Sequence, residues 1–141
     1  MRGVIPVGFC ALLAWPACDD RSYREIGGAI DFLTKRSNEL PGPAIARLRE
    51  SGRRAVPQIE TAMHTASARG KVNLVAALAA IGEPESAAIL RHFAVYDANA
   101  EVRTACEEVL ETWAAAGDAR TGPAKQALAR IAEKRRLGQA Q

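Results

Sequence analysis

Residues 46–52 read ARLRESG, and residues 76–82 read AALAAIG. The two segments align with Ala, Leu and Gly in register, so that Leu48 corresponds to Leu78 and Gly52 to Gly82. After each glycine a second pair of segments aligns at almost the same offset, AVPQI at 55–59 with SAAIL at 86–90. Self-similarity at this period is typical of proteins built from stacked two-helix units. We therefore expect a helical hairpin that is repeated along the chain.

Apolar residues within the repeat recur at helical spacing. Val56, Ile59 and Met63 fall at positions i, i+3 and i+7, which places them on one face of an amphipathic helix. Equivalent positions of successive units should meet along a continuous core, and four residues are predicted to be buried there: Ile59, Leu78, Leu90 and Leu110.

Glycine, proline and asparagine residues mark the expected ends of the helices. Gly52 and Gly82 stand where a left-handed helix stop is favoured, and Asn99 is a suitable N-cap. Three prolines fit the first turn of a helix: Pro57, Pro84 and Pro123. The pattern predicts an all-α fold, a short α-solenoid of antiparallel hairpins with about seven helices, near 22–36, 42–51, 54–67, 70–81, 84–95, 99–116 and 122–137. The last helix should cap the stack with Leu128 and Ile131 facing inward.

The composition agrees with one helical domain. The chain has 141 residues, of which 48% are hydrophobic and 25% charged, while aromatic residues make up only 5%. These fractions are typical of a globular protein, and the scarcity of aromatic residues favours helices over strands. The net charge of +3 is too small to indicate a nucleic-acid partner by itself.

The second of these units resembles a known repeat family. Residues 81–85 read IGEPE, and Asp97 and Arg103 follow. This stretch resembles the short HEAT-like repeats of bilin lyases, over roughly residues 40–116. The resemblance implies a structural ladder in which a loop Asp and an Arg of the second helix link neighbouring units. Asp97 and Arg103 match those positions, whereas the preceding unit carries Lys71 in place of Arg and lacks the Asp.

The N-terminus has the pattern of an export signal. Residues 4–14 form an apolar run that is too short to span a bilayer, because a transmembrane helix needs about twenty such residues. Residues 13–18 read LAWPAC and resemble the lipobox of bacterial lipoproteins, although that family prefers Leu where Trp15 stands. The resemblance implies a signal peptide at 1–17, removal of that peptide, lipidation of Cys18, and a HEAT-like domain at 18–141.

Two other interpretations of the N-terminus remain open. The signal could be cut near Ala14 or Ala17 to release a soluble secreted protein, or the segment could be the uncleaved start of a cytosolic protein. With the lipobox, we expect an exported protein that is anchored in a membrane and faces the periplasm or the cell surface. Asp19 directly after the cysteine resembles an inner-membrane retention signal, which slightly favours the inner membrane.

The sequence contains no recognisable catalytic, metal-binding or cofactor-binding motif, so we expect neither an enzyme nor a cofactor. His64 and His92 have neither a carboxylate nor a second histidine at i+3 or i+4, and they are predicted to be surface residues. Cys106 lies on an apolar stripe, which predicts a buried and inert thiol. The basic runs at 35–36, 53–54 and 134–136 alternate with glutamates, which is typical of solvated helix faces.

The functional prediction follows from the fold and the signal. We expect a non-enzymatic protein-protein interaction or scaffold module, tethered to the bacterial cell envelope by the lipidated Cys18. Its protein partner is not identified by any motif. Two alternatives are a cytosolic HEAT-like accessory subunit of an enzyme and a HEAT-like nucleic-acid-binding protein.

Overall fold

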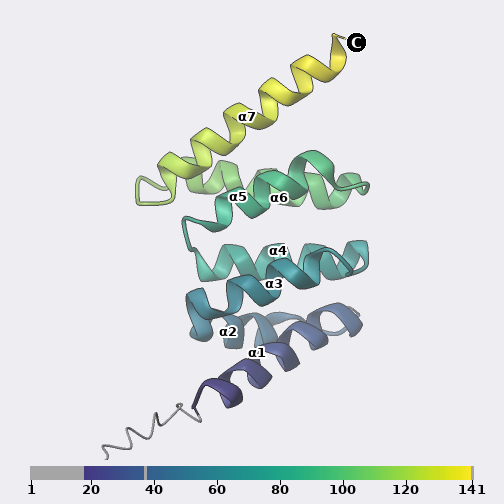
Figure 1. The fold of residues 1–141 in the computed structure, drawn as a ribbon, viewed down its shortest axis with the longest axis vertical. Helices are drawn as coiled ribbons and strands as arrows, with labels where there is room; N and C mark the ends of the chain where they lie inside the picture. Colours follow the sequence, from purple (N-terminus) through teal and green to yellow (C-terminus); the bar gives the residue numbers. More distant parts are fainter. Residues whose placement is uncertain (1–17, 37, 141) are drawn as a thin grey trace, which may run out of the picture.

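A computed structural model describes residues 18–36 and 38–140, and within these residues the fold is all-helical without a β-strand (Figure 1). The elements are α1 (Cys18–Lys35), α2 (Gly42–Ser51), the 3-10 helix η1 (Gly52–Ala55), α3 (Val56–Met63), α4 (Ala68–Ile81), α5 (Ser86–Tyr96), α6 (Ala100–Ala114) and α7 (Thr121–Gln139).

Helices that follow each other in the sequence pack as pairs, and the pairs lie one above another along the long axis of the molecule (Figure 1). α1 packs on α2, α3 on α4, and α5 on α6. The second helices of the pairs also contact one another, α2 with α4 and α4 with α6, and α7 packs on both helices of the last pair. As a result, α1 and α7 lie at opposite ends of the molecule.

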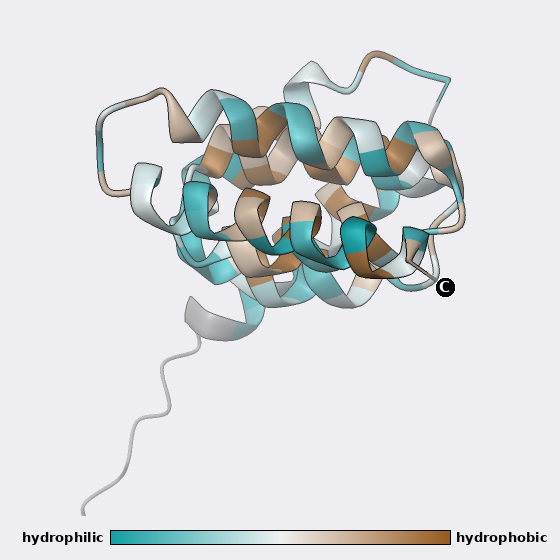
Figure 2. Cartoon of the chain, turned by 90° about the horizontal axis from the view of Figure 1, so that it is seen from above, coloured by the Kyte–Doolittle hydropathy of each residue, from teal (hydrophilic) through white to brown (hydrophobic). Residues whose placement is uncertain are grey.

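One apolar core runs through these pairs. Brown apolar and teal polar residues alternate at short intervals along each helix, as amphipathic helices require (Figure 2). The four residues predicted for the core have no solvent-exposed surface, which confirms that part of the prediction: Ile59, Leu78, Leu90 and Leu110. Ile131 of α7 is also buried, so the last helix closes this end of the core.

Local chemistry explains where α4 ends and α6 begins. Gly82 adopts a left-handed conformation at φ 71°, and its N–H donates to the Leu78 carbonyl at 3.0 Å. At the start of α6, the Asn99 side-chain oxygen accepts hydrogen bonds from the backbone N–H groups of Glu101 and Val102. Both of these predicted helix ends are confirmed.

The predicted helix at 54–67 is wrong in both its length and its form. Gly52 has φ 59° and starts η1, and the following α3 has only eight residues. Pro57 has no N–H to bond to the Arg53 carbonyl, so a regular α-helix cannot continue through this point. About seven helices were predicted. Within the described residues, six α-helices contain ten residues or more, and α3 is shorter.

The predicted start of the helix at 84–95 is also corrected. α5 begins at Ser86, and Pro84 lies in the turn before it, where the Pro84 carbonyl accepts a hydrogen bond from the Ala87 N–H at 3.1 Å. At its other end α5 reaches Tyr96, because the Asp97 N–H still donates to the Phe93 carbonyl. The turn before α5 is therefore longer than we predicted when we placed Pro84 in the first turn of the helix.

The predicted signal peptide at 1–17 lies outside the described residues. Cys18 is the first residue of α1, and its side chain also lies outside them. Among the helices that the structure describes, none combines the length and the apolar character needed to cross a membrane.

Candidate protein-interaction face

The row formed by α4 and α6 carries an apolar groove of about 360 Å³. Trp113 is almost completely buried beneath it, and the groove continues to Arg120 at one end. The apolar side chains that line the groove come from both helices and include Val72, Val75, Ala76, Ala79, Val109 and Trp113.

The outward face of α4 is apolar because no charged residue occurs between Lys71 and Glu83. Val72, Ala76 and Ala79 follow at i, i+4 and i+7, which places them on one side of the helix. Two of these three side chains are single methyl groups. Side chains this short would allow another helix to pack closely against α4.

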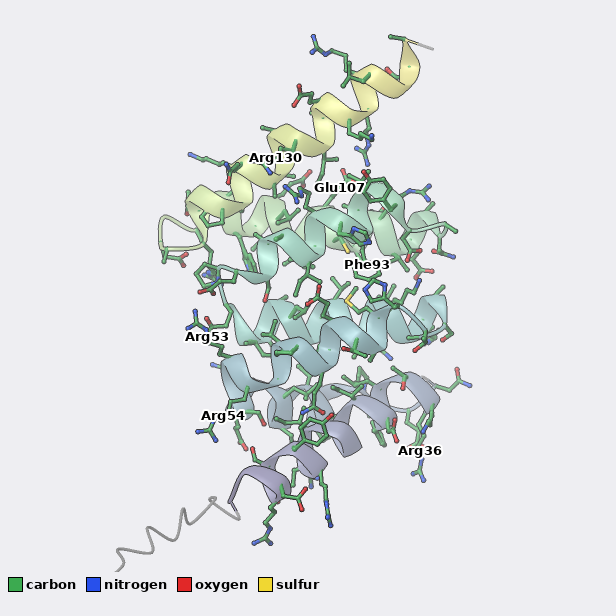
Figure 3. All side chains as sticks on the ribbon, viewed as in Figure 1. Arg36, Arg53, Arg54, Phe93, Glu107 and Arg130 are labelled. Carbon is green, nitrogen blue, oxygen red and sulfur yellow. The ribbon has the colours of Figure 1, made fainter. Side chains whose placement is uncertain are left out.

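The outward face of α6 is acidic. Glu101, Glu108 and Glu111 are exposed and follow at i, i+7 and i+10, and Glu108 borders the groove. Among the residues that the structure describes, none forms an ion pair with these three carboxylates. Glu107 differs, because it turns towards α7 and accepts a hydrogen bond from Arg135 at 2.9 Å (Figure 3). We call Glu101, Glu108 and Glu111 the acidic strip.

Arg120 closes one end of the groove. Its guanidinium lies 5.7 Å from the centre of the Trp113 ring, a distance at which cations are attracted to the indole face. The same guanidinium donates to Asp118 at 3.0 Å, and this hydrogen bond lowers the pKa of Asp118 to about 2. Arg120 is therefore held in place over the buried indole.

The residues predicted for the repeat ladder lie behind this face. The Lys71 ammonium of α4 is 2.6 Å from the Asp97 carboxylate in the turn between α5 and α6. Their side chains are only 18% and 3% exposed, so this ion pair connects two helix pairs from within the protein. Asp97 also accepts a hydrogen bond from the Asn99 N–H at 2.9 Å.

Two opposing effects act on the pKa of Asp97. Burial favours the neutral acid, but the hydrogen bonds from Lys71 and the Asn99 N–H, together with the charges of Lys71 and Arg103, outweigh it and lower the pKa. Asp97 is therefore held as a carboxylate.

Arg103 reaches the same turn in a different way. Its guanidinium donates to the backbone carbonyls of Asp97 and Ala98, at 2.7 and 3.0 Å. The ladder residues Lys71, Asp97 and Arg103 are thus close together, with Lys71 bound to the carboxylate and Arg103 bound to the backbone. This geometry fixes the turn and engages all three side chains in structural contacts.

The two histidines, which the sequence placed at unrelated surface positions, lie next to each other. His64 and His92 are both exposed, and their ring centroids are 6.0 Å apart. Sequence reasoning missed this contact because it tested only positions one helical turn away. The two histidines are also closer in the sequence than one full repeat, so the repeat did not indicate the contact either.

Cys106 is fully buried, and burial raises the pKa of its thiol to about 12. A thiol of this kind stays protonated at neutral pH and is a poor nucleophile. In the described part of the chain, no group of three or more His, Cys, Asp or Glu residues is placed to hold a metal ion.

No protein-family model, curated protein or solved structure matches the chain.

Proposed function

We propose that this protein is a non-enzymatic binding module, a short HEAT-like α-solenoid whose α4–α6 groove holds a helical segment of a partner protein. One observation supports this most directly. An apolar groove lies beside three exposed carboxylates that have no ion-pair partner among the described residues. Apolar surface bordered by uncompensated charge is typical of an interface whose second half is another protein.

The arrangement defines the kind of segment that would fit. Small side chains on α4 allow a helix to pack closely, and its apolar stripe would cover Val72 and Ala76. The acidic strip extends along α6, so the same segment should carry Lys or Arg residues on the neighbouring side. Exposed charge pairs of this kind add little affinity, but they set the orientation of the segment and accelerate its association.

The HEAT-like assignment has its own support. Segments that align in the sequence repeat lie in successive helix pairs, and the second helices of these pairs form one row. The Lys71–Asp97 ion pair links two pairs at the position where the family ladder would lie. In such solenoids each unit is stabilised mainly by its neighbours, which leaves the row of second helices available for binding.

We also propose that Cys18 is lipidated and anchors the module in the bacterial cell envelope. The lipobox-like sequence before Cys18 supports this proposal. Because α1 begins at Cys18, a lipid on that residue would hold the α1 end of the stack close to the bilayer without an intervening linker. The groove between α4 and α6 would then lie further along the stack, accessible to a partner.

Site-specific photocrosslinking tests the groove. A photoreactive residue at Ala76 should yield one discrete adduct in native membranes, whereas the same residue at Arg130, which is exposed on α7 and does not line the groove, should yield none (Figure 3). The combined Glu108→Lys and Glu111→Lys change should strongly reduce the adduct, because it places like charges opposite the basic residues of the segment, while Glu60→Lys on α3 serves as a surface control. Equal crosslinking from Ala76 and Arg130, or no effect of charge reversal, contradicts the proposal.

Membrane fractionation tests the anchor separately. The wild type should remain with membranes in high salt and leave them in detergent, because two or more acyl chains anchor a protein firmly. Cys18→Ser should lose this behaviour, and Cys10→Ser should keep it. Identical partitioning of wild type and Cys18→Ser, together with a mature N-terminus at a residue other than 18, contradicts lipidation and favours a secreted or cytosolic protein.

A further inference from the structure

A pair of imidazoles joins the second and third helix pairs on the face opposite the groove row. His64 directly follows α3, and His92 lies on α5, so neither ring depends on the other's helix for its position. Their ring centroids are 6.0 Å apart with an interplanar angle of 60°. Phe93 is buried beside them, with its ring centre 5.2 Å from each histidine ring (Figure 3).

We propose that His64 and His92 together bind one divalent transition-metal cation of the zinc type. Imidazole nitrogen is a preferred ligand for such cations, with metal-nitrogen distances of about 2.0–2.1 Å. A cation shared by one nitrogen of each ring would hold the ring centroids roughly 5–6 Å apart. The observed separation of 6.0 Å lies at the upper end of that range.

The surroundings favour a defined site over two independent surface rings. The Phe93 ring contacts both imidazoles, and Tyr96 packs against His92 with ring centroids 5.2 Å apart. These contacts restrict the rotation of both histidines and so reduce the entropy that is lost when a cation fixes them. Lys71 lies near Phe93, but its charge is balanced by Asp97.

The cation would have two protein ligands, and water would complete its coordination. The site would therefore connect α3 to α5 and add a metal link between two helix pairs. It does not depend on the proposed function of the α4–α6 groove, because none of its residues lines that groove.

Zinc titration of the tag-free full-length chain in detergent tests the site. Isothermal titration calorimetry should show one more Zn²⁺ bound per chain in the wild type than in the double variant His64→Gln with His92→Gln. Each single variant should lose at least tenfold in affinity at this site. Any zinc bound by cysteines is common to all four proteins and cancels in the comparison.

A second measurement separates a shared cation from two independent histidines. With Zn²⁺, amide exchange in residues 56–64 and 86–96 should slow in the wild type and stay unchanged in the double variant. Both histidines are exposed, so these substitutions should preserve the fold, which circular dichroism verifies. Equal zinc binding in the wild type and the double variant, or wild-type affinity in either single variant, overturns the proposal.

Discussion

Two ion-pair sites connect segments that are distant in the sequence, and they differ in their exposure to water. Lys71 and Asp97 form one site, with side chains 18% and 3% exposed. Arg53 forms the other, with Glu85 and with Glu83 at 3.5 Å, and there Arg53 is 70%, Glu85 61% and Glu83 29% exposed (Figure 3). Lys71 of α4 is paired with the turn between α5 and α6, whereas Arg53 of η1 is paired with the turn between α4 and α5, so the two sites show how burial changes what an ion pair contributes.

Burial changes the consequence of losing one partner. A charge left without its partner inside the protein costs several kcal/mol, whereas an exposed charge is hydrated by water when its partner is removed. Loss of the Lys71–Asp97 pair should therefore destabilise the fold, whereas loss of the Arg53 site should have little effect. The loss of stability on truncating a buried core residue provides the reference value with which the losses at both sites can be compared.

Leu78→Ala should have the largest effect. Leu78 is fully buried, and truncating a buried leucine costs about 2–5 kcal/mol through lost burial and the cavity that remains. Urea unfolding followed by circular dichroism measures the change. A neutral substitution would show that the helix pairs do not share a continuous core.

Asp97→Ala should follow, with a loss of about 3 kcal/mol, at the low end for a broken buried ion pair because Lys71 can partly reach water. The variant leaves the Lys71 ammonium without its partner and removes the acceptor of the Asn99 N–H. Adding Lys71→Met to Asp97→Ala should restore part of the stability. If Lys71→Met changes the stability of the wild type and of Asp97→Ala by the same amount, the pair has no measurable coupling.

Acid should weaken the same contact. Because the folded protein has a lowered pKa for Asp97, this carboxylate contributes stability above its unfolded pKa, near 3.8, and the contribution is lost as the pH falls through the folded value. The stability difference between wild type and Asp97→Asn should therefore be constant from neutral pH to about pH 5 and shrink below about pH 4. If the stability difference between wild type and Asp97→Asn grew as the pH falls, the lowered pKa of Asp97 would be contradicted.

Arg53→Gln should have the smallest effect, with no measurable shift in the unfolding midpoint, because Arg53 and Glu85 are exposed to water and Glu83 is partly exposed, so that water hydrates the carboxylates when Arg53 is removed. Arg54→Gln is the matched control, since Arg54 is an exposed neighbour that forms no ion pair with the described residues (Figure 3). A loss for Arg53→Gln that approached the loss for Asp97→Ala would show that exposure does not separate the two sites.

The sequence predicted the features that depend on local chemistry or on helical periodicity. Buried positions such as Leu90 were identified because apolar residues recur at helical spacing, and the bounds of α2 at 42–51 match the prediction. Asn99 and Gly82 were identified as helix ends because their preferences act within one turn. The break before α3 was missed, because a proline marks a first turn without showing that a 3-10 helix precedes it.

The groove and the histidine pair could not be predicted in the same way. Both depend on how one helix pair is rotated and displaced relative to the next, which no short pattern in the sequence specifies. Val72 and Val109 look like ordinary amphipathic positions until α4 and α6 are placed side by side. The ladder residues illustrate the same point, because the repeat resemblance matched Asp97 and Arg103 to the ladder positions but did not indicate that Lys71 would bind the Asp97 carboxylate or that Arg103 would bind carbonyl groups.

The far end of α7 behaves differently from the rest of the stack. Ile131 is its last buried residue, Arg135 is held by Glu107, and the residues from 136 to 139 are exposed where the helix extends past its neighbours (Figure 1). A helix end without tertiary contacts opens locally at almost no free-energy cost. A trypsin-like protease should therefore remove this end from the folded protein after Arg136 and leave the packed pairs intact, so early cleavage there reports fraying of α7 and not unfolding of the stack.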